Sequence, residues 1–346
     1  MTTPTLTRRG ALLGAAAGLC LAPRARATEA GGAWTDGPPL PLAVQEIYPA
    51  VLDGTAFVVG GLTVGAAGLG ISDRVFSWRP GAPGWGEHAP LPVATHHANC
   101  LGHDGRLLAL GGFTGAGGGD WTMTAAVWRY DPATDAWEPG PDLPAPQAEA
   151  VSGLIGGRVH LAAGRQVAAA SNFDYGHHGD TAAHLVLEPG ATTWTPAAPL
   201  PSPRNSAAGA VLDGRLHVVG GRTLAGGNTS AHDAYLADED RWQALAPLPV
   251  PAAGPRGAGG LAMAALGGRL HVFGGEWFSD GRGVYHQVWS WSPATDAWEE
   301  AAPMPMPRHG LGAVAIGDQV LTIAGATRAG ASGTTATVQL VTPPAG

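Results

Sequence analysis

Residues 130–144 read YDPATDAWEPGPDLP, and the spacing within this stretch recurs along the chain. Trp137 follows the bulky Tyr130 by seven residues and precedes a Leu-Pro pair, which begins at Leu143, by six. Five other tryptophans precede Leu-Pro or Met-Pro by the same distance, and four of them also follow a bulky apolar residue by seven: Trp34, Trp85, Trp194, Trp242 and Trp298. A repeat at fixed spacing indicates one structural unit built several times.

A pair of small residues ends an apolar run in each repeat. The pairs are Gly60-Gly61, Gly111-Gly112, Ala163-Gly164, Gly220-Gly221, Gly274-Gly275 and Ala324-Gly325. Asp-Gly steps such as Asp53-Gly54 precede several of these runs, and Asp-Gly between two apolar runs predicts a tight hairpin. No helical pattern follows the glycine pairs, so they are not phosphate-binding loops; we expect them to let neighbouring strands approach closely.

The period of about 50 residues predicts blades of four strands each, the arrangement of a β-propeller. Strand a is expected before the Asp-Gly turn, strand b ends at the small pair, strand c ends near the bulky residue, and strand d surrounds the Trp. The sixth unit supplies strands a to c within 313–341 and ends without a Trp. We therefore expect residues 33–36, which include the unmatched Trp34, to supply strand d of the last blade and close the ring.

The pattern resembles the kelch-repeat family over essentially all of residues 28–346. Typical kelch elements are Gly220-Gly221, Pro203-Arg204 and the spacing from Tyr130-Asp131-Pro132 to Trp137. The resemblance implies an all-β fold, a six-bladed kelch β-propeller closed by the N-terminal strand. It does not fix the function, because kelch propellers include both enzymes and pure binding modules.

Residues 1–27 resemble a twin-arginine export signal. Arg8-Arg9 opens a small apolar run, and Ala25-Arg26-Ala27 forms a cleavage site of the A-x-A type. A membrane anchor is the alternative, but the run is too short and too rich in Gly and Ala to span a bilayer well. We expect a periplasmic or secreted protein with no membrane contact after cleavage, and a propeller domain over residues 28–346.

The mature chain is acidic. Four of the 19 basic residues lie in the signal, which leaves 15 against 27 acidic ones, so nucleic acid is not expected as a partner. The chain contains no lysine, which excludes Schiff-base chemistry at lysine. Cys100 is the one cysteine left after cleavage, so no internal disulfide is expected.

Side chains just before each strand a are expected to face the mouth of the central channel. Sixteen residues before the small pairs stand Val44, Thr95, Gln147, Arg204, Ala258 and Arg308; in the fifth unit we expect the nearby Arg256 to take this role after a short shift. Fourteen residues before the pairs stand Glu46, His97, Glu149, Ser206, Gly260 and Gly310. The residues directly after the pairs, among them Arg165, Arg222 and Glu276, should reach the same region.

Several arginines converging on a concave mouth predict a site for a small anion, because the guanidinium fork matches a carboxylate. The predicted binding residues are Arg204, Arg256, Arg308, Arg165, Arg222, Glu46, Asn205 and Trp277. The alternative is that these arginines pair with glutamates as structural struts between blades.

The longest loop, residues 166–180, could cover the mouth as a lid. His177, His178, Asp180 and His184 follow no standard zinc spacing, and adjacent strand residues such as His96 and His97 point to opposite faces. A solvated loop is the favoured interpretation, and no metal or other cofactor is predicted.

A short segment resembles N-acetylneuraminate epimerase, a periplasmic kelch mutarotase: Gly275-Glu276 is followed, after five residues, by Arg282. This resemblance implies Glu276 and Arg282 as catalytic residues and a small acidic carbohydrate as ligand. Mutarotation needs an acid and a base, for which Glu149, His97 and Glu46 are further candidates, and it needs no cofactor. Trp277 or Phe113 is expected to pack on the face of the sugar ring.

Two alternatives remain. A copper enzyme similar to galactose oxidase requires a Cys–Tyr pair, and Cys100 lies in an apolar strand that is typical of core. The other alternative is a non-catalytic kelch module that binds a protein or glycan partner through the same face. The sequence leaves open whether the protein is an enzyme, a sugar mutarotase (an isomerase), or a binding module.

Overall fold

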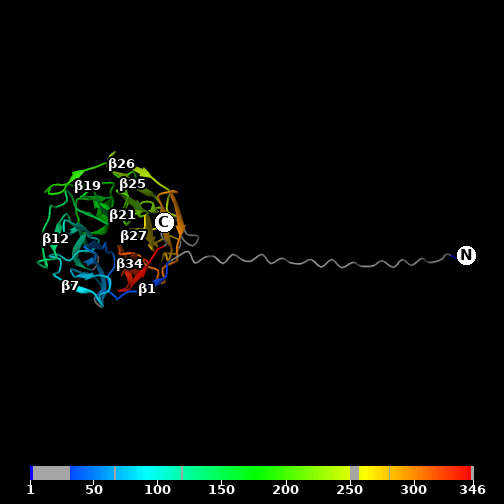
Figure 1. The fold of residues 1–346 in the computed structure, drawn as a ribbon. Helices are drawn as coiled ribbons and strands as arrows, with labels where there is room; N and C mark the ends of the chain where they lie inside the picture. Colours follow the sequence, from blue (N-terminus) through cyan, green and yellow to red (C-terminus); the bar gives the residue numbers. More distant parts are fainter. Residues whose placement is uncertain (3–31, 66–67, 118–119, 250–256, 280, 344–346) are drawn as a thin grey trace.

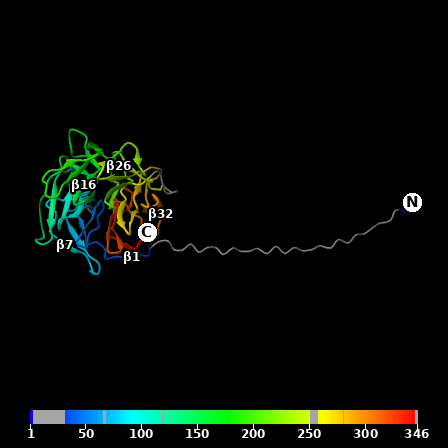
Figure 2. The same cartoon turned by 45° about the horizontal axis from the view of Figure 1, so that its top comes forward.

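The computed structural model describes residues 1–2, 32–65, 68–117, 120–249, 257–279 and 281–343. Most of the predicted export signal, and Arg256, lie outside these residues. Within them, antiparallel strands form six four-stranded sheets arranged around a common centre (Figures 1 and 2). The all-β propeller class predicted from the sequence is confirmed, and η1 (Tyr175–His177) is the sole helix of this part of the chain. No helix here is long and apolar enough to cross a membrane.

The first and second strands of each sheet form the hairpin that carries the Asp-Gly or similar turn. The first strands are β2 (Ala50–Leu52), β8 (Asn99–His103), β15 (Val151–Ile155), β21 (Ala208–Leu212), β27 (Ala262–Leu266) and β33 (Gly312–Ile316). The second strands are β3 (Thr55–Val59), β9 (Arg106–Leu110), β16 (Arg158–Ala162), β22 (Arg215–Val219), β28 (Arg269–Phe273) and β34 (Gln319–Ile323). The first strands line the channel.

The third and fourth strands complete each sheet. The third strands are β6 (Val75–Trp78), β12 (Val127–Asp131), β19 (His184–Leu187), β25 (His232–Leu236), β31 (Val288–Ser292) and β37 (Val338–Val341). The fourth strands are β7 (Gly86–His88), β13 (Ala136–Pro139), β20 (Thr195–Pro196), β26 (Arg241–Ala244), β32 (Ala297–Glu300) and β1 (Trp34–Asp36). Strand β1 pairs antiparallel with β37 in the sheet of β33 and β34, and Trp34 lies opposite Val341.

Short hairpins connect the second and third strands on one face of the propeller. They are β4 (Leu62–Gly65) with β5 (Gly68–Ile71), β10 (Phe113–Gly117) with β11 (Asp120–Met123), β17 (Arg165–Val167) with β18 (His178–Asp180), β23 (Arg222–Thr223) with β24 (Gly227–Asn228), β29 (Glu276–Trp277) with β30 (Gly283–Val284), and β35 (Ala326–Arg328) with β36 (Ser332–Thr334). Strand β14 (Gln147–Ala148) adds to β17. The segments that lead into the first strands emerge on this same face, because neighbouring strands are antiparallel.

The small pairs join each sheet to the next. The second residue of each pair donates its backbone N–H to a carbonyl of the following sheet's entry segment, at 2.8 to 3.0 Å: Gly61 to Thr95, Gly112 to Gln147, Gly164 to Arg204, Gly221 to Ala258, Gly275 to Arg308 and Gly325 to Val44. A Cβ added at Gly60 would lie 2.1 Å from the Thr95 carbonyl oxygen. Glycine therefore permits the close approach that the sequence predicts.

The repeated tryptophans form a second set of contacts between neighbouring sheets, farther from the channel. Each indole N–H donates to a carbonyl between neighbouring blades, at 2.8 to 3.2 Å: Trp34 to Ala302, Trp85 to Pro38, Trp137 to Ala89, Trp194 to Pro141, Trp242 to Ala198 and Trp298 to Ala246. Trp34 takes part in this series and also packs edge-on against Phe273 of the preceding blade. One Trp side chain per repeat thus packs between neighbouring sheets and donates a hydrogen bond to a backbone carbonyl there.

Two buried histidine pairs lie between the second and third strands. His160 Nδ1 is 3.0 Å from His184 Nε2, and His217 Nδ1 is 2.9 Å from His232 Nε2. Burial lowers the pKa of His160 and of His232 to about 4 and that of His217 to about 3. These rings are therefore neutral in the folded protein at neutral pH.

The lowered pKa values predict a loss of stability in acid. Below pH 6.5 the unfolded chain binds protons that the folded chain does not, so the contribution of each ring is complete above pH 6.5 and falls toward its folded pKa near 3 to 4. A histidine shifted from 6.5 to about 4 contributes up to about 3 kcal/mol. Chemical denaturation between pH 4 and 7 should therefore show a free energy of unfolding that rises steeply with pH. In H217L/H232L this rise should be smaller. The exposed His286→Gln should leave the slope unchanged; an equal slope in all three proteins would contradict this account.

Candidate functional site: a pocket at the channel mouth

Six equivalent residues form a ring around the channel, which we call the belt: Glu46, His97, Glu149, Ser206, Gly260 and Gly310. All six have left-handed backbone, with φ between 51 and 63°. Five backbone hydrogen bonds of 2.7 to 3.2 Å link neighbours around the belt, including one from the Glu46 N–H to the Gly310 carbonyl. Glycine adopts this conformation freely, whereas other residues are strained in it, so the four side chains on the belt are held there at a cost.

A cavity of about 300 Å³ lies above the belt on the face that carries the short hairpins, and we call it the mouth pocket. Its walls are Glu46, Leu62, His97, Trp121, Glu149, Tyr175, Arg222, Glu276, Phe278, Gly330 and Ala331. These residues come from the belt and from the connections between second and third strands. The pocket therefore draws on several blades, which the antiparallel topology brings to one face.

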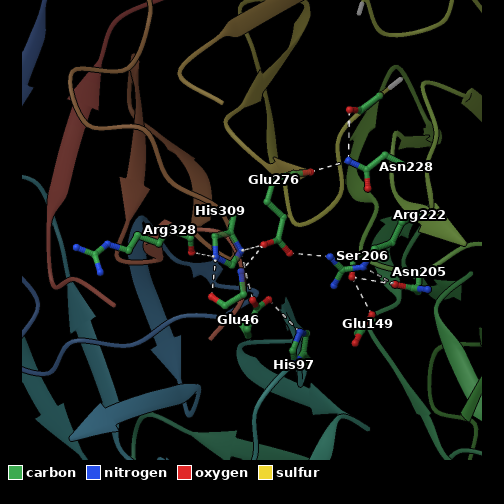
Figure 3. Close-up of polar contacts among 12 residues, drawn as sticks. Glu46, His97, Glu149, Asn205, Ser206, Arg222, Asn228, Glu276, His309 and Arg328 are labelled. Atoms are coloured by element: carbon green, nitrogen blue, oxygen red, sulfur yellow. Dashed lines mark hydrogen bonds and ion pairs between the residues drawn. The ribbon is translucent and has the colours of Figure 1, made fainter. Parts of the chain in front are cut away.

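Glu46 is held by two histidines on either side (Figure 3). Its carboxylate oxygens lie 2.9 Å from His97 Nε2 and 3.5 Å from His309 Nδ1. Burial alone would raise the pKa of Glu46, but His97, His309 and Arg222 together hold that pKa well below its usual value. Behind His97 lies His96, whose pKa is lowered by burial and by its neighbour, and the two Nδ1 atoms are 2.7 Å apart. Glu46 is thus a carboxylate at neutral pH.

Glu276 and Arg222 form the second charged group of the pocket (Figure 3). Arg222 Nη1 donates to Glu276 Oε1 at 2.6 Å, and the Gly330 N–H donates to Oε2 at 2.7 Å. His309 Nδ1 lies 3.3 Å from Glu276 Oε2, so this ring stands between the carboxylates of Glu46 and Glu276. Although burial opposes the charge on Arg222, the carboxylates of Glu149 and Glu276 and the nearby Tyr175 raise its pKa.

Glu149 completes the set of acids. Its Oε2 accepts a hydrogen bond from Ser206 Oγ at 2.7 Å, and its Oε1 lies 3.4 Å from the Tyr175 hydroxyl. Burial raises the pKa of Glu149, but His97, Arg165 and Arg222 reverse this, so the net shift is downward. Three carboxylates and their basic partners therefore surround the pocket in one connected network.

Side-chain exposure separates the groups that a ligand can reach from those that only support them. Glu149 and Glu276 are 1 and 2% exposed, whereas Glu46 is 14% and Arg222 is 18% exposed. Trp121, Tyr175 and Phe278 supply aromatic walls. A ligand in the pocket would thus meet one carboxylate, one guanidinium and three aromatic rings.

The structure brings five of the predicted site residues to this pocket: Glu46, His97, Glu149, Arg222 and Glu276. Asn205 lies directly beneath, where it accepts a hydrogen bond from Arg222 Nε at 3.3 Å. Trp277 does not line the pocket; it packs on Tyr285 with ring centroids 4.5 Å apart.

The expectation that five arginines meet at the mouth is corrected. Arg204 and Arg308 are buried between strands, where Arg204 pairs with Asp233 at 2.8 Å and Arg308 donates to the carbonyls of Ala324 and Thr337. A belt residue with left-handed backbone follows each of these arginines by two positions. It interrupts the regular alternation of side chains along a strand, so the arginine and the belt residue do not point to the same face. Both arginines are structural, but the alternative interpretation is not confirmed in detail, because their partners are Asp233 and groups of their own sheets rather than glutamates of another sheet.

Three further predicted residues lie elsewhere. Arg282 is exposed and outside the pocket, so the Glu276 to Arg282 spacing does not bring its two ends together. Arg165 is fully buried behind Tyr175. Arg256 lies outside the described residues, and the backbone position expected of it is occupied by Ala258, which accepts the hydrogen bond from Gly221 at 2.8 Å.

His309 and the aromatic walls were not identified from the sequence. His309 directly precedes the belt glycine Gly310, at a position where the residue type differs between most repeats. The aromatic residues lie in connections of unequal length, where no repeat spacing applies. Among the described residues, no group of three or more His, Cys, Asp or Glu side chains is arranged to hold a metal.

Comparison with known proteins agrees with this architecture. The kelch motif matches residues 94–144 and 258–305. Kelch-like protein terF of Aspergillus terreus is 30% identical over 267 residues, which cover 75% of this chain and 56% of that protein. Kelch-like protein 35 of Mus musculus is 32% identical over 182 residues, 52% of this chain and 27% of that protein. The chain thus spans about half or less of the length of these curated relatives.

The solved structure of YjhT superposes with a TM-score of 0.72 over 87% of this chain and 95% of that one, at 17% identity, which shows a shared fold. Fold and site together define a β-propeller with a polar pocket at one end of its channel. The repeats, the motif matches and the relatives assign the chain to a family: it is a kelch-repeat protein.

Proposed function

We propose that this protein binds one small hydroxylated ring, of monosaccharide size, in the mouth pocket. The observation that carries the proposal is the accessible pair of Glu46 and Arg222 between aromatic walls. Carboxylate and guanidinium groups offer an acceptor and donors to ring hydroxyls, and aromatic faces pack on the apolar face of a ring. A volume of about 300 Å³ is at the small end of ligand pockets, which suits a single ring.

The charge balance of the pocket bears on the ligand. Three carboxylates, Glu46, Glu149 and Glu276, stand against one arginine on the wall, Arg222. The acidic sugar expected from the sequence depended on an arginine cluster that is not assembled here. The resting pocket therefore favours a ligand whose hydroxyl groups, rather than an anionic group, make the polar contacts.

The same geometry supports mutarotation. In our proposal the Glu46 carboxylate takes the proton of the anomeric hydroxyl as the ring C–O bond opens, and the ring oxygen takes a proton from water. Arg222 stabilises the negative charge that develops on the ring oxygen. On reclosure the hydroxyl oxygen attacks the other face of the carbonyl carbon and gives its proton back to the hydroxide left by that water. Glu46 returns its proton to the carbonyl oxygen, so neither protons nor a cofactor are consumed.

The test is a thermal-shift screen with hexoses, pentoses and their uronic acids, followed by NMR exchange spectroscopy on any ring that binds. Binding at a hundredfold excess over Kd should stabilise the protein by about 2.7 kcal/mol. E46Q should still bind the ring but slow anomer exchange by about a hundredfold or more. Glu87→Gln, an exposed residue of the same blade, is the matched control. If no ring raises the Tm, the proposal fails; if E46Q exchanges anomers at the wild-type rate, only the catalytic part fails.

A non-catalytic module that binds a protein is the second candidate. Exposed large apolar residues surround the mouth on the connections of this face: Val64, Val93, Phe173, Leu224 and Phe278. Such a rim is a common feature of protein-binding surfaces. A screen in which no small molecule binds, combined with loss of a captured partner in F173S/L224S, would favour this candidate over the first.

We also propose that the six sheets are the six blades of one closed ring. The support is the series of hydrogen bonds from each small pair to the next sheet, whose last member runs from Gly325 back to Val44, and the pairing of β1 with β37. Trp34→Ala should lower the free energy of unfolding by about 3 kcal/mol. The exposed Thr35→Ala on the same strand should have little effect. Unchanged stability of W34A in chemical denaturation would contradict closure by this strand.

Export through the twin-arginine route remains our proposal for residues 1–27. It rests on Arg8-Arg9, the apolar run and Ala25-Arg26-Ala27. Mass spectrometry of the protein from a periplasmic or culture fraction should find a chain that begins at Thr28. Retention of the wild-type full-length chain in the cytoplasm would contradict the proposal, as would export of R8K/R9K at the wild-type level.

A further inference from the structure

Arg165 is the most unusual buried group of the described residues. The side chain is 0% exposed, and none of its three guanidinium nitrogens has a hydrogen-bond partner. The nearest carboxylate oxygen, Glu149 Oε2, lies 3.9 Å from Nε, and that oxygen is already bonded to Ser206. A guanidinium carries five N–H donors, so all of this hydrogen-bonding capacity is unused.

The buried arginines that have a structural role in this fold do have hydrogen-bond partners. Arg308, equally buried, donates to three backbone carbonyls and to the side chains of Thr322 and Gln339. Arg204 donates to the Val218 carbonyl and to Asp233. Buried polar groups without a partner are rare in folded proteins and call for an explanation. The contrast indicates that Arg165 is not a third strut.

Tyr175 separates Arg165 from the mouth pocket. Its ring centroid lies 3.5 Å from the Arg165 guanidinium carbon, so the ring covers one face of the cation, while Tyr175 also forms a wall of the pocket. Removal of this one ring would join the guanidinium to the pocket. A stacked ring attracts the cation but accepts no hydrogen bond in the plane of its N–H groups.

The segment that carries Tyr175 is fastened at both ends. Asn172 exchanges two hydrogen bonds with the backbone of Met123, and His178 Nε2 lies 3.0 Å from Asn172 Oδ1. Between these points, residues 173–177 include the exposed Phe173 and the short helix η1. We call residues 173–177 the flap. The flap backbone is held in place, because the Ala168 N–H donates to the His177 carbonyl at 2.9 Å and Asp174 forms a β-bridge with Asp120. The Tyr175 ring can therefore leave Arg165 by rotation of its side chain.

We propose that Arg165 is an anion subsite that takes the carboxylate group of a small ligand when the Tyr175 ring leaves it. The guanidinium fork can donate two parallel hydrogen bonds to a carboxylate, which supplies the partners that the resting state lacks. The subsite adjoins the pocket but does not require the sugar chemistry proposed above, because a carboxylate alone should occupy it.

The test uses sodium acetate as the probe, without any sugar, against sodium chloride at equal ionic strength. Acetate should raise the Tm of the wild-type protein above the chloride value, and R165M should abolish this difference. Y175A should bind acetate about tenfold more tightly, because the competing ring is gone. Arg158→Met, an exposed arginine of the same blade, should respond as the wild type does.

Two results would overturn the proposal. One is an equal response to acetate in the wild type and in R165M, which means non-specific binding only. The other is no response in either the wild type or Y175A. The Tm of R165M in sodium chloride is a second, independent measurement. It should be at least as high as that of the wild type, whereas it would be lower if Arg165 had a structural role. If R165M does not fold, R165Q serves in its place, and the Y175A result still decides.

Discussion

Each blade is bound to the next by a hydrogen bond from the second residue of its small pair to a carbonyl at the entry of the following blade. The donor is glycine in all six pairs, with φ between 94 and 112°, and a Cβ added at Gly164 would lie 2.3 Å from the Ala148 carbonyl oxygen. This contact also fixes where the entry segment turns, and two residues later the chain adopts left-handed backbone at the belt. The position of every side chain on the pocket floor depends on this one contact.

The belt explains which repeats supply side chains to the floor of the pocket. Gly260 and Gly310 occupy it without strain, whereas Glu46, His97, Glu149 and Ser206 adopt the same φ with a side chain, at an expected 1 to 3 kcal/mol each. Strain of this kind persists where the side chain is needed. Each glutamate has a basic partner within 4 Å: His97 for Glu46, Arg165 for Glu149, and Arg222 and His309 for Glu276.

Most of the fold could be predicted from the sequence, because the small pairs and the Trp spacing repeat in every unit. The same alignment of repeats located Glu46, His97, Glu149, Arg222 and Glu276. It was wrong for Arg204 and Arg308, because their partners, such as Asp233, are distant in sequence. The left-handed backbone two residues later also interrupts the alternation of side chains along the strand. Tyr175 and Phe278 lie in loops that differ between blades, where no periodicity gives a position.

The central claim is that the mouth pocket receives a single ring between Glu46 and Arg222. The most direct measurement is a crystal structure of the mature protein soaked with the monosaccharides that bind. The account predicts one ring in the pocket, with hydroxyl oxygens within hydrogen-bond distance of the Glu46 carboxylate and the Arg222 guanidinium, and with one face against Trp121, Tyr175 or Phe278. A ring bound on the outer rim or on another surface, with the pocket holding only solvent, would contradict it.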